Sequence, residues 1–114
     1  MRRGEIWIIN LSPTLGAEMQ KTRPAVIVND DEVGILPLKV IVPITDWKDR
    51  YAQAPWMVRL DPSSENGLSK VSTADAFQVR SVSEQRFVSC LGSLSPDNLE
   101  AIGNALRRVL QLLP

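Results

Sequence analysis

The sequence contains no histidine and only one cysteine, and these shortages exclude several kinds of chemistry. A Cys/His zinc site needs more thiol or imidazole ligands than the chain offers. A nucleophile that relies on histidine as its general base is excluded on the same ground, and one cysteine forms no internal disulfide. Any catalysis therefore depends on carboxylates, hydroxyls, lysine or arginine, and we expect neither a metal site nor a cofactor.

The chain also lacks net charge and long apolar runs. Its 13 Lys and Arg residues balance its 13 Asp and Glu residues, so no overall basic field attracts nucleic acid, although a local basic patch is still compatible with that balance. No apolar run approaches the roughly 20 residues of a membrane-spanning helix. The first residues, Met1 to Gly4, lack the apolar core of a signal peptide. We therefore expect a cytoplasmic protein with no membrane partner.

What the sequence does contain is the composition of a globular protein, with 44% hydrophobic and 23% charged residues in a chain of 114. A chain of this length holds one hydrophobic core. No linker, internal repeat or low-complexity segment divides it. We expect a single domain over residues 1–114.

Segments rich in β-branched and aromatic residues predict a mainly β structure. The predicted strands span residues 4–10, 24–29, 39–45, 56–60, 70–73, 76–80 and 87–91, and residues 83–86 form a turn of helix. Pro43 has no N–H to donate, which predicts an edge or a bulge in the third strand. We expect three aromatic side chains, Trp7, Trp56 and Phe77, to lie in the core. Cys90 stands in an apolar stretch, which predicts that it is a small core residue.

The last element is an amphipathic helix. Ser95 is a good N-cap, Pro96 suits the first helical position and Asp97 suits the positive end of the helix dipole. Apolar residues then recur at three- and four-residue spacing to about residue 113. Six or seven short strands closed by one helix predict a small, partly open barrel with the helix packed against it.

A polar segment, residues 16–23, runs directly into the apolar second strand. Pro24 favours an extended conformation for Arg23, so the guanidinium is held at the root of the loop, where it suits a phosphate or a carboxylate. Thr45 stands where the third strand opens into another loop. The alternative for residues 16–23 is an ordinary hairpin loop with solvated charges.

Six short segments stand in a characteristic order along the chain. They are RGEIW (3–7), LSPT (11–14), GAE (16–18), KTRPAVIV (21–28), VPIT (42–45) and AFQVRSV (76–82), followed by the leucine-rich helix. As an ordered set they resemble the MazF/PemK family of bacterial toxin endoribonucleases, over nearly the whole chain. The resemblance implies a barrel of the SH3-like, CcdB/PemK type with a C-terminal helix.

The resemblance also implies a function. Such a protein is a sequence-specific, metal-independent endoribonuclease that cleaves single-stranded mRNA as the toxin of a type II toxin–antitoxin system. A cognate antitoxin holds it inactive, and it works as a homodimer. Attack by the RNA 2′-hydroxyl leaves a cyclic phosphate and a 5′-hydroxyl.

Carried over by motif, the catalytic residues of the family correspond to Arg23, Thr45 and Glu18. A permanently charged guanidinium stabilises phosphoryl oxygens, and a threonine hydroxyl can donate to the same phosphate. The general base near neutral pH must be a carboxylate. Glu18 is the first candidate for it and Asp46 the second.

Specific reading of single-stranded RNA packs bases on aromatic or guanidinium planes and hydrogen-bonds their edges. Side chains in or beside the expected groove are Gln20, Lys21, Trp47, Gln78 and Arg80. Trp47 could instead plug the barrel end, Arg80 could pair with Asp75, and Lys21 could be a solvated loop charge. The loop lacks the histidine of some relatives and has Met19 where glutamine is common, so the recognised base sequence is not predicted.

Two other hypotheses for the function are compatible with the sequence. One is a non-enzymatic binding module of the same fold that acts on a protein target such as DNA gyrase. The other is a scaffold that has lost activity but still binds an antitoxin. Because fold alone does not determine function, the presence of both Arg23 and Thr45 is what favours the nuclease.

Overall fold

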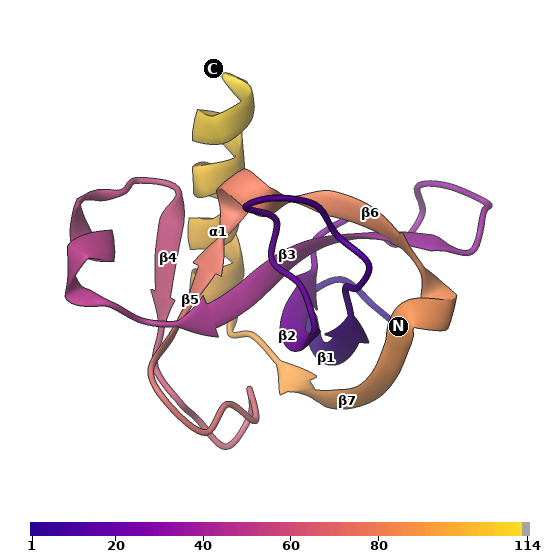
Figure 1. Cartoon of the computed structure of the whole chain (residues 1–114), viewed down its shortest axis with the longest axis horizontal. Coiled ribbons are helices and arrows are strands. Elements are labelled where there is room, and N and C mark those ends of the chain that lie inside the picture. The colour runs from indigo at the N-terminus through magenta and orange to yellow at the C-terminus, as the bar shows by residue number, and fades with distance from the viewer. Residues whose placement is uncertain (113–114) are drawn as a thin grey trace.

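The computed structural model describes residues 1–112, and these form seven strands, three short 3-10 helices and one α-helix (Figure 1). The strands are β1 (Glu5–Asn10), β2 (Thr22–Ile27), β3 (Leu38–Asp46), β4 (Met57–Leu60), β5 (Ser72–Asp75), β6 (Arg80–Ser83) and β7 (Phe87–Ser93). The helices are η1 (Asp49–Gln53), η2 (Ala76–Gln78), η3 (Glu84–Arg86) and α1 (Pro96–Leu110). The mainly β fold with a C-terminal helix is as predicted.

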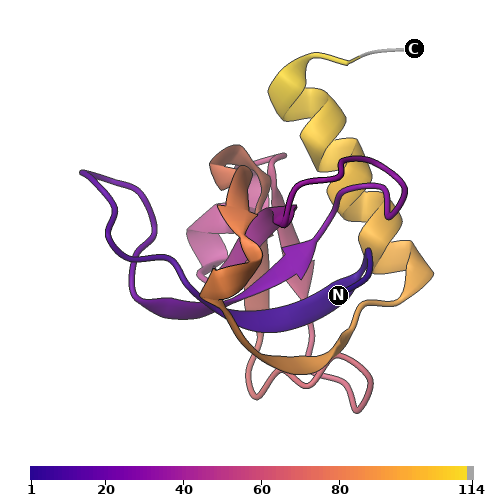
Figure 2. The ribbon, with the colours of Figure 1, turned by 90° about the vertical axis from the view of Figure 1, so that its right-hand side faces the viewer.

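One antiparallel sheet contains all these strands, and β3 is its centre. The order is β4-β5-β3-β2-β1-β7, and β6 pairs with β3 outside this path. On one side β3 pairs with β2, and on the other it pairs first with β6 and then with β5. The sheet curves strongly and α1 packs at one end (Figure 2), which is the partly open barrel expected from the sequence.

Pro43 lies inside this sheet, so the first of the two predicted alternatives, a sheet edge rather than a bulge, was wrong. It pairs with Ala25 of β2. On its other side the ladder to β6 ends at Ile41 and the ladder to β5 begins at Ile44. The missing N–H therefore falls where β3 changes partners, and the interruption of the ladder that proline predicts is present there.

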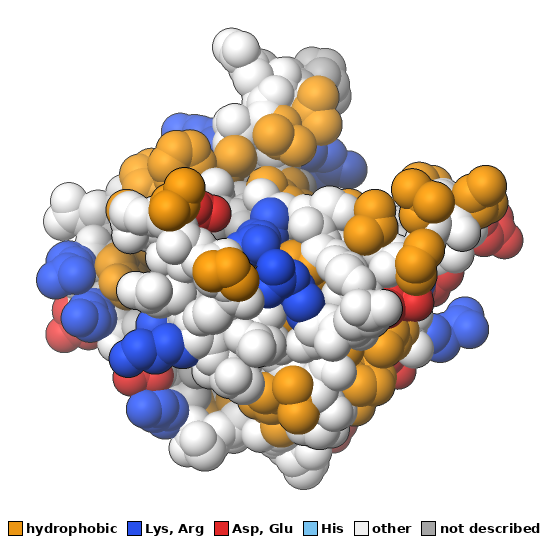
Figure 3. Space-filling view, turned by 45° about the vertical axis from the view of Figure 1, so that its right-hand side comes forward, with side chains coloured by type: hydrophobic (Ala, Val, Ile, Leu, Met, Phe, Trp, Pro, Cys, Tyr) orange, Lys and Arg blue, Asp and Glu red, His pale blue; other side chains and the backbone are white. Residues whose placement is uncertain are grey.

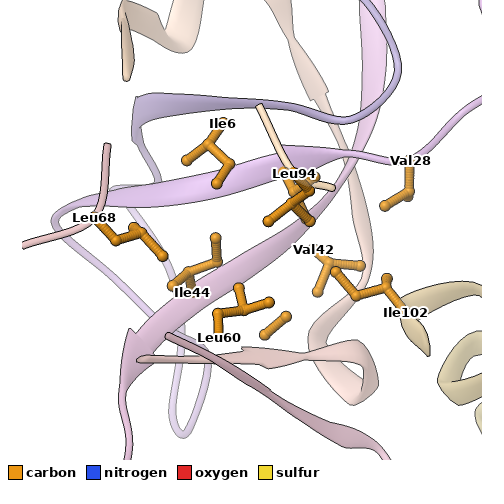
Figure 4. Close-up of a cluster of buried hydrophobic side chains, with 10 residues drawn as sticks. Ile6, Val28, Val42, Ile44, Leu60, Leu68, Leu94 and Ile102 are labelled. Carbon is orange, nitrogen blue, oxygen red and sulfur yellow. The ribbon is translucent and has the colours of Figure 1, made fainter. Parts of the chain in front are cut away.

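Both faces of the central strands are buried. One core cluster contains Val26 and Val42 and receives Ile102 from α1 (Figure 4), whereas Ala25 and Ile27 belong to a second cluster. Successive side chains of a strand point to opposite faces, so β2 supplies both clusters. This explains why β2 reads as a continuous apolar run rather than as an alternating one.

The ends of α1 follow from local chemistry. The Ser95 hydroxyl accepts a hydrogen bond from the Asn98 N–H at 3.2 Å, as its N-cap prediction requires. Gln111 adopts a left-handed conformation (φ 56°) and caps the carboxyl end. The helix therefore ends at Leu110, before the end at about residue 113 that the sequence predicted, and only residues 113–114 lie outside the described residues. Within residues 1–112, no helix combines the length and apolar content of a membrane span.

Residues 76–80 do not form the strand that the sequence predicted. Ala76–Gln78 forms a 3-10 turn because the Asp75 carboxylate accepts a hydrogen bond from the Phe77 N–H at 3.1 Å. The turn directs Phe77 outward, where 71% of its surface is exposed, and Trp56 beside it is 38% exposed. Neither is the core residue predicted from the sequence.

Cys90 is also exposed, contrary to its predicted burial. It lies on β7, the last strand in the sheet order, which pairs only with β1 among the described strands. The middle of β7, from Val88 to Cys90, is open to solvent. Trp7 is half-buried and meets Phe87 edge to face, with ring centroids 5.7 Å apart.

Candidate active site

Arg23 and Thr45 lie opposite each other at matching ends of β2 and β3. The register of these strands pairs Ala25 with Pro43. Two residues further along each antiparallel strand, the same register places Arg23 beside Thr45, and side chains so placed share a face. The Arg23 Nη1 donates a hydrogen bond to the Thr45 Oγ1 at 3.2 Å. The structure thus brings together the two residues expected to carry the chemistry.

The Arg23 side chain is fixed at two points. Its Nε donates to the Gln20 carbonyl at 2.9 Å, and its Nη1 donates to Thr45. In the described part of the chain these bonds leave the Nη2 donors unused. Thr45 accepts from Arg23, so its own hydroxyl proton is also available. Two donors from neighbouring strands are therefore held together for one acceptor.

These donors line a cavity of about 340 Å³ at the end of the sheet. Besides Arg23 and Thr45 it is lined by Asp46 and by the turn before β5, which contributes Gly67 and Lys70. The Lys70 Nζ and an Asp46 carboxylate oxygen are 3.1 Å apart, and both side chains are mostly exposed. An exposed pair of this kind is held weakly, so the Lys70 ammonium can turn toward a bound anion.

Glu18 lies in a different cavity. Its carboxylate accepts a hydrogen bond from the Leu15 N–H at 2.8 Å, and the side chain is exposed. The cavity that it lines measures about 410 Å³ and includes Met19, Phe77 and Arg80. The structure does not place Glu18 in the cavity of Arg23 and Thr45, whereas Asp46, the second carboxylate named from the sequence, is there.

The predicted RNA-binding residues fall into three groups. Gln20 and Lys21 are exposed in the loop between β1 and β2, where the Lys21 backbone is left-handed (φ 70°). Trp47 is half-buried after β3, beside Tyr51 and under the Arg59 guanidinium. Gln78 and Arg80 line the cavity of Glu18. As RNA-binding residues these five remain predictions.

Arg80 and Asp75 do not form the ion pair that was the alternative to an RNA contact for Arg80. Within the described residues the Arg80 Nη1 is buried without a hydrogen-bond partner. Asp75 instead accepts from the Phe77 N–H at 3.1 Å and from the Gln78 amide at 3.2 Å. Burial raises the pKa of Asp75, and these two bonds act in the opposite direction.

Sequence reasoning missed the turn that lines the first cavity. The Pro, Ser, Asn and Gly residues within 61–67 are typical of a turn, but nothing in their order shows that Gly67 and Lys70 fold back toward Thr45. Gly67 has a left-handed backbone (φ 69°), and an added Cβ would lie 2.2 Å from the Leu91 carbonyl oxygen. Only glycine tolerates both conditions, which is the one local signal for this close approach.

The fold and the paired donors define a class of protein, a small antiparallel barrel with a cavity lined by hydrogen-bond donors at the ends of two central strands. The model of the PemK-like, MazF-like toxins of type II toxin–antitoxin systems matches residues 2–110. The chain belongs to this family. The prediction made from the sequence motifs is confirmed.

Individual relatives agree with this assignment. The chain is 33% identical over 119 aligned residues to endoribonuclease MazF9 of Mycobacterium tuberculosis, with 98% of each chain covered. Its fold matches MazF of Deinococcus radiodurans with a TM-score of 0.79 at 24% identity, over 97% of this chain and 96% of that one. It also matches a mycobacterial endoribonuclease in complex with its cognate antitoxin, with a TM-score of 0.76 at 19% identity, over 100% and 98% of the two chains. The gyrase-directed alternative is not favoured by these relatives.

Proposed function

We propose that this MazF-like endoribonuclease toxin cleaves single-stranded RNA in the cavity of Arg23 and Thr45, without a metal ion. The observation that supports the proposal is the hydrogen bond from the Arg23 Nη1 to the Thr45 Oγ1, which leaves a guanidinium N–H and a hydroxyl proton free for one phosphate. Guanidinium and phosphate form strong, directional contacts. Arg23 supplies the positive charge that a metal ion supplies in other nucleases.

The reaction uses the 2′-hydroxyl of RNA as the nucleophile. Its oxygen attacks the adjacent phosphorus, the bond to the 5′ oxygen breaks, and the products are a 2′,3′-cyclic phosphate and a 5′-hydroxyl. Negative charge grows on the phosphoryl oxygens during the attack, and Arg23 and Thr45 are placed to stabilise it. A carboxylate takes the 2′-hydroxyl proton, and a proton must return to the leaving 5′ oxygen.

The biological setting follows from the family. Solved relatives include a mycobacterial endoribonuclease with its cognate antitoxin and a MazE-MazF assembly of Deinococcus radiodurans. For this chain we propose sequence-specific cleavage of mRNA in the bacterial cytoplasm, inhibition by a cognate antitoxin and a homodimeric state. We also propose that residues 1–114 act as one toxin domain.

The test is cleavage of a long, mixed-sequence single-stranded RNA in EDTA, with the cut sites mapped. We expect discrete cuts by the wild type and a loss of about 100-fold or more in Arg23→Ala, the usual effect of removing a donor to developing charge. Arg107→Ala is the control, because Arg107 contacts Asn104 of its own helix. Thr45→Val should also lose most activity, and Thr45→Ser should keep it.

Two outcomes would contradict the proposal. Full activity in a folded Arg23→Ala variant would place the reaction elsewhere. The absence of cutting by a folded wild type, across several RNAs, would favour a non-enzymatic role on a protein target.

A further inference from the structure

A row of hydrogen bonds connects a buried carboxylate with the loop beside the active site. Asp75 is 5% exposed, and its Oδ2 accepts from the Gln78 Nε2 at 3.2 Å. The Gln78 Oε1 accepts from the backbone N–H of Met19 at 2.7 Å. Gln78 therefore bridges β5 and the loop between β1 and β2, although these segments are far apart in the sequence.

This bridge is one of two hydrogen-bonded attachments of the loop to distant segments; in the other, the Arg86 Nη1 donates to the Ser12 carbonyl at 2.7 Å, at the root of the loop. The loop projects from the sheet (Figure 2). Within residues 13–20 the other hydrogen bonds join loop residues to one another or to Arg23 at the start of β2. The bond from Met19 to Gln78 is thus the hydrogen bond that connects these residues to the far side of the fold, beside the packing of the Met19 side chain against the second core cluster.

The loop position matters because it fixes the arginine. Gln20, the residue after Met19, provides the carbonyl that accepts from the Arg23 Nε at 2.9 Å. A displacement of the loop backbone at Met19 would move this carbonyl and change the direction of the guanidinium. Misplacement of a catalytic group by about 1 Å can cost about 100-fold in rate.

We propose that Asp75 and Gln78 are positioning residues, which hold Met19 and thereby the Gln20 carbonyl and the Arg23 guanidinium in the arrangement that cleavage requires. This inference rests on the proposed function. It gives Gln78 a different role from the RNA contact predicted from the sequence, and it gives a role to Asp75, which the catalytic site does not use directly.

The polarity of the row makes the proposal testable. An ionised carboxylate only accepts and a backbone N–H only donates, so the Gln78 amide must present its nitrogen to Asp75 and its oxygen to Met19. Asp75→Asn places a second amide beside the Gln78 amide. If the new amide keeps its oxygen on the Phe77 N–H, its nitrogen faces the Gln78 nitrogen, and the hydrogen bond between positions 75 and 78 is lost unless Gln78 turns its oxygen away from Met19. Gln78→Glu places two carboxylates together. In the double variant the amide at position 75 can donate to the carboxylate at position 78, which still accepts from Met19.

The experiment compares both single variants, the double variant and Gln85→Glu, a control on an exposed glutamine whose contact is through its backbone. Cleavage of an RNA with a mapped cut site gives kcat and KM, amide hydrogen exchange reports protection at Met19, and thermal unfolding verifies folding. We expect each single variant to lose Met19 protection and about 10-fold or more in kcat. The double variant should recover both, and the control should change neither.

The results separate two kinds of failure. Wild-type kcat in the single variants, or a double variant that regains Met19 protection without regaining kcat, would overturn the positioning role. If the wild type itself cuts no RNA, the proposed function fails and the positioning role fails with it.

Discussion

At the scale of single residues, two carboxylates expected near the chemistry stand in separate cavities. Glu18 lines the cavity with Met19 and Arg80, whereas Asp46 lines the cavity with Arg23 and Thr45. A general base must reach the proton it removes, directly or through one water. Asp46 therefore replaces Glu18 as the first candidate for the base.

The prediction is that Asp46→Asn lowers kcat by about 100-fold or more, as expected for the loss of a positioned general base. Asp61→Asn is the matched control, because that exposed aspartate contacts Arg59. Cleavage rates between pH 4 and pH 8 measure the effect. A large loss in Glu18→Gln with little change in Asp46→Asn would return the role to Glu18.

Local sequence predicts some of this site. Pro24 indicates that Arg23 stands at the root of a loop, and the strand pattern places Thr45 at a strand end. Their contact depends on the register between β2 and β3, which neither segment encodes alone. The bridge from Asp75 through Gln78 to Met19 was missed for the same reason, since three separate segments supply its members.

At the scale of elements, the sequence predicts those whose signals are local. The capping serine and the apolar spacing of α1, and the apolar run of β3, appear in the structure close to their expected bounds. At Ala76–Gln78 the β propensity of Phe77 and Val79 competes with the capping carboxylate of Asp75, and the cap prevails.

At the scale of elements, substitutions of two glycines, Gly92 and Gly103, are predicted to change stability in opposite directions. An added Cβ at Gly92 of β7 would lie 2.1 Å from the Glu65 carbonyl oxygen, whereas Gly103 of α1 has open space. We expect Gly92→Ala to lower the free energy of unfolding by about 1–3 kcal/mol, as overpacking does. Gly103→Ala should raise it by about 0.8–1 kcal/mol through helix propensity. Urea denaturation measures both, and equal effects would contradict the close approach between β7 and the turn.

At the scale of the whole molecule, charge is balanced and dispersed. The chain carries no formal net charge, and Figure 3 shows basic, acidic and apolar side chains interspersed over one face. A chain without net charge has no overall basic field to attract RNA from a distance. Binding must then depend on a few local cations, and Arg23 and Lys70 are the basic side chains that line the proposed cleavage cavity.

The salt dependence of RNA binding tests this conclusion. For single strands, log K falls with log [salt] by about 0.7 for each phosphate neutralised, so the two cations of this cavity contribute about −1.4 to the slope. The probe is an RNA with a 2′-deoxy nucleotide at the mapped cut site, which binds but lacks the attacking hydroxyl. Lys70→Met should reduce the slope by about 0.7, because one phosphate contact is lost, while Lys48→Met, on the exposed residue before η1, should leave it unchanged. A wild-type slope steeper than about −4 would require many more phosphate contacts than this cavity provides, and would move RNA binding to an extended surface.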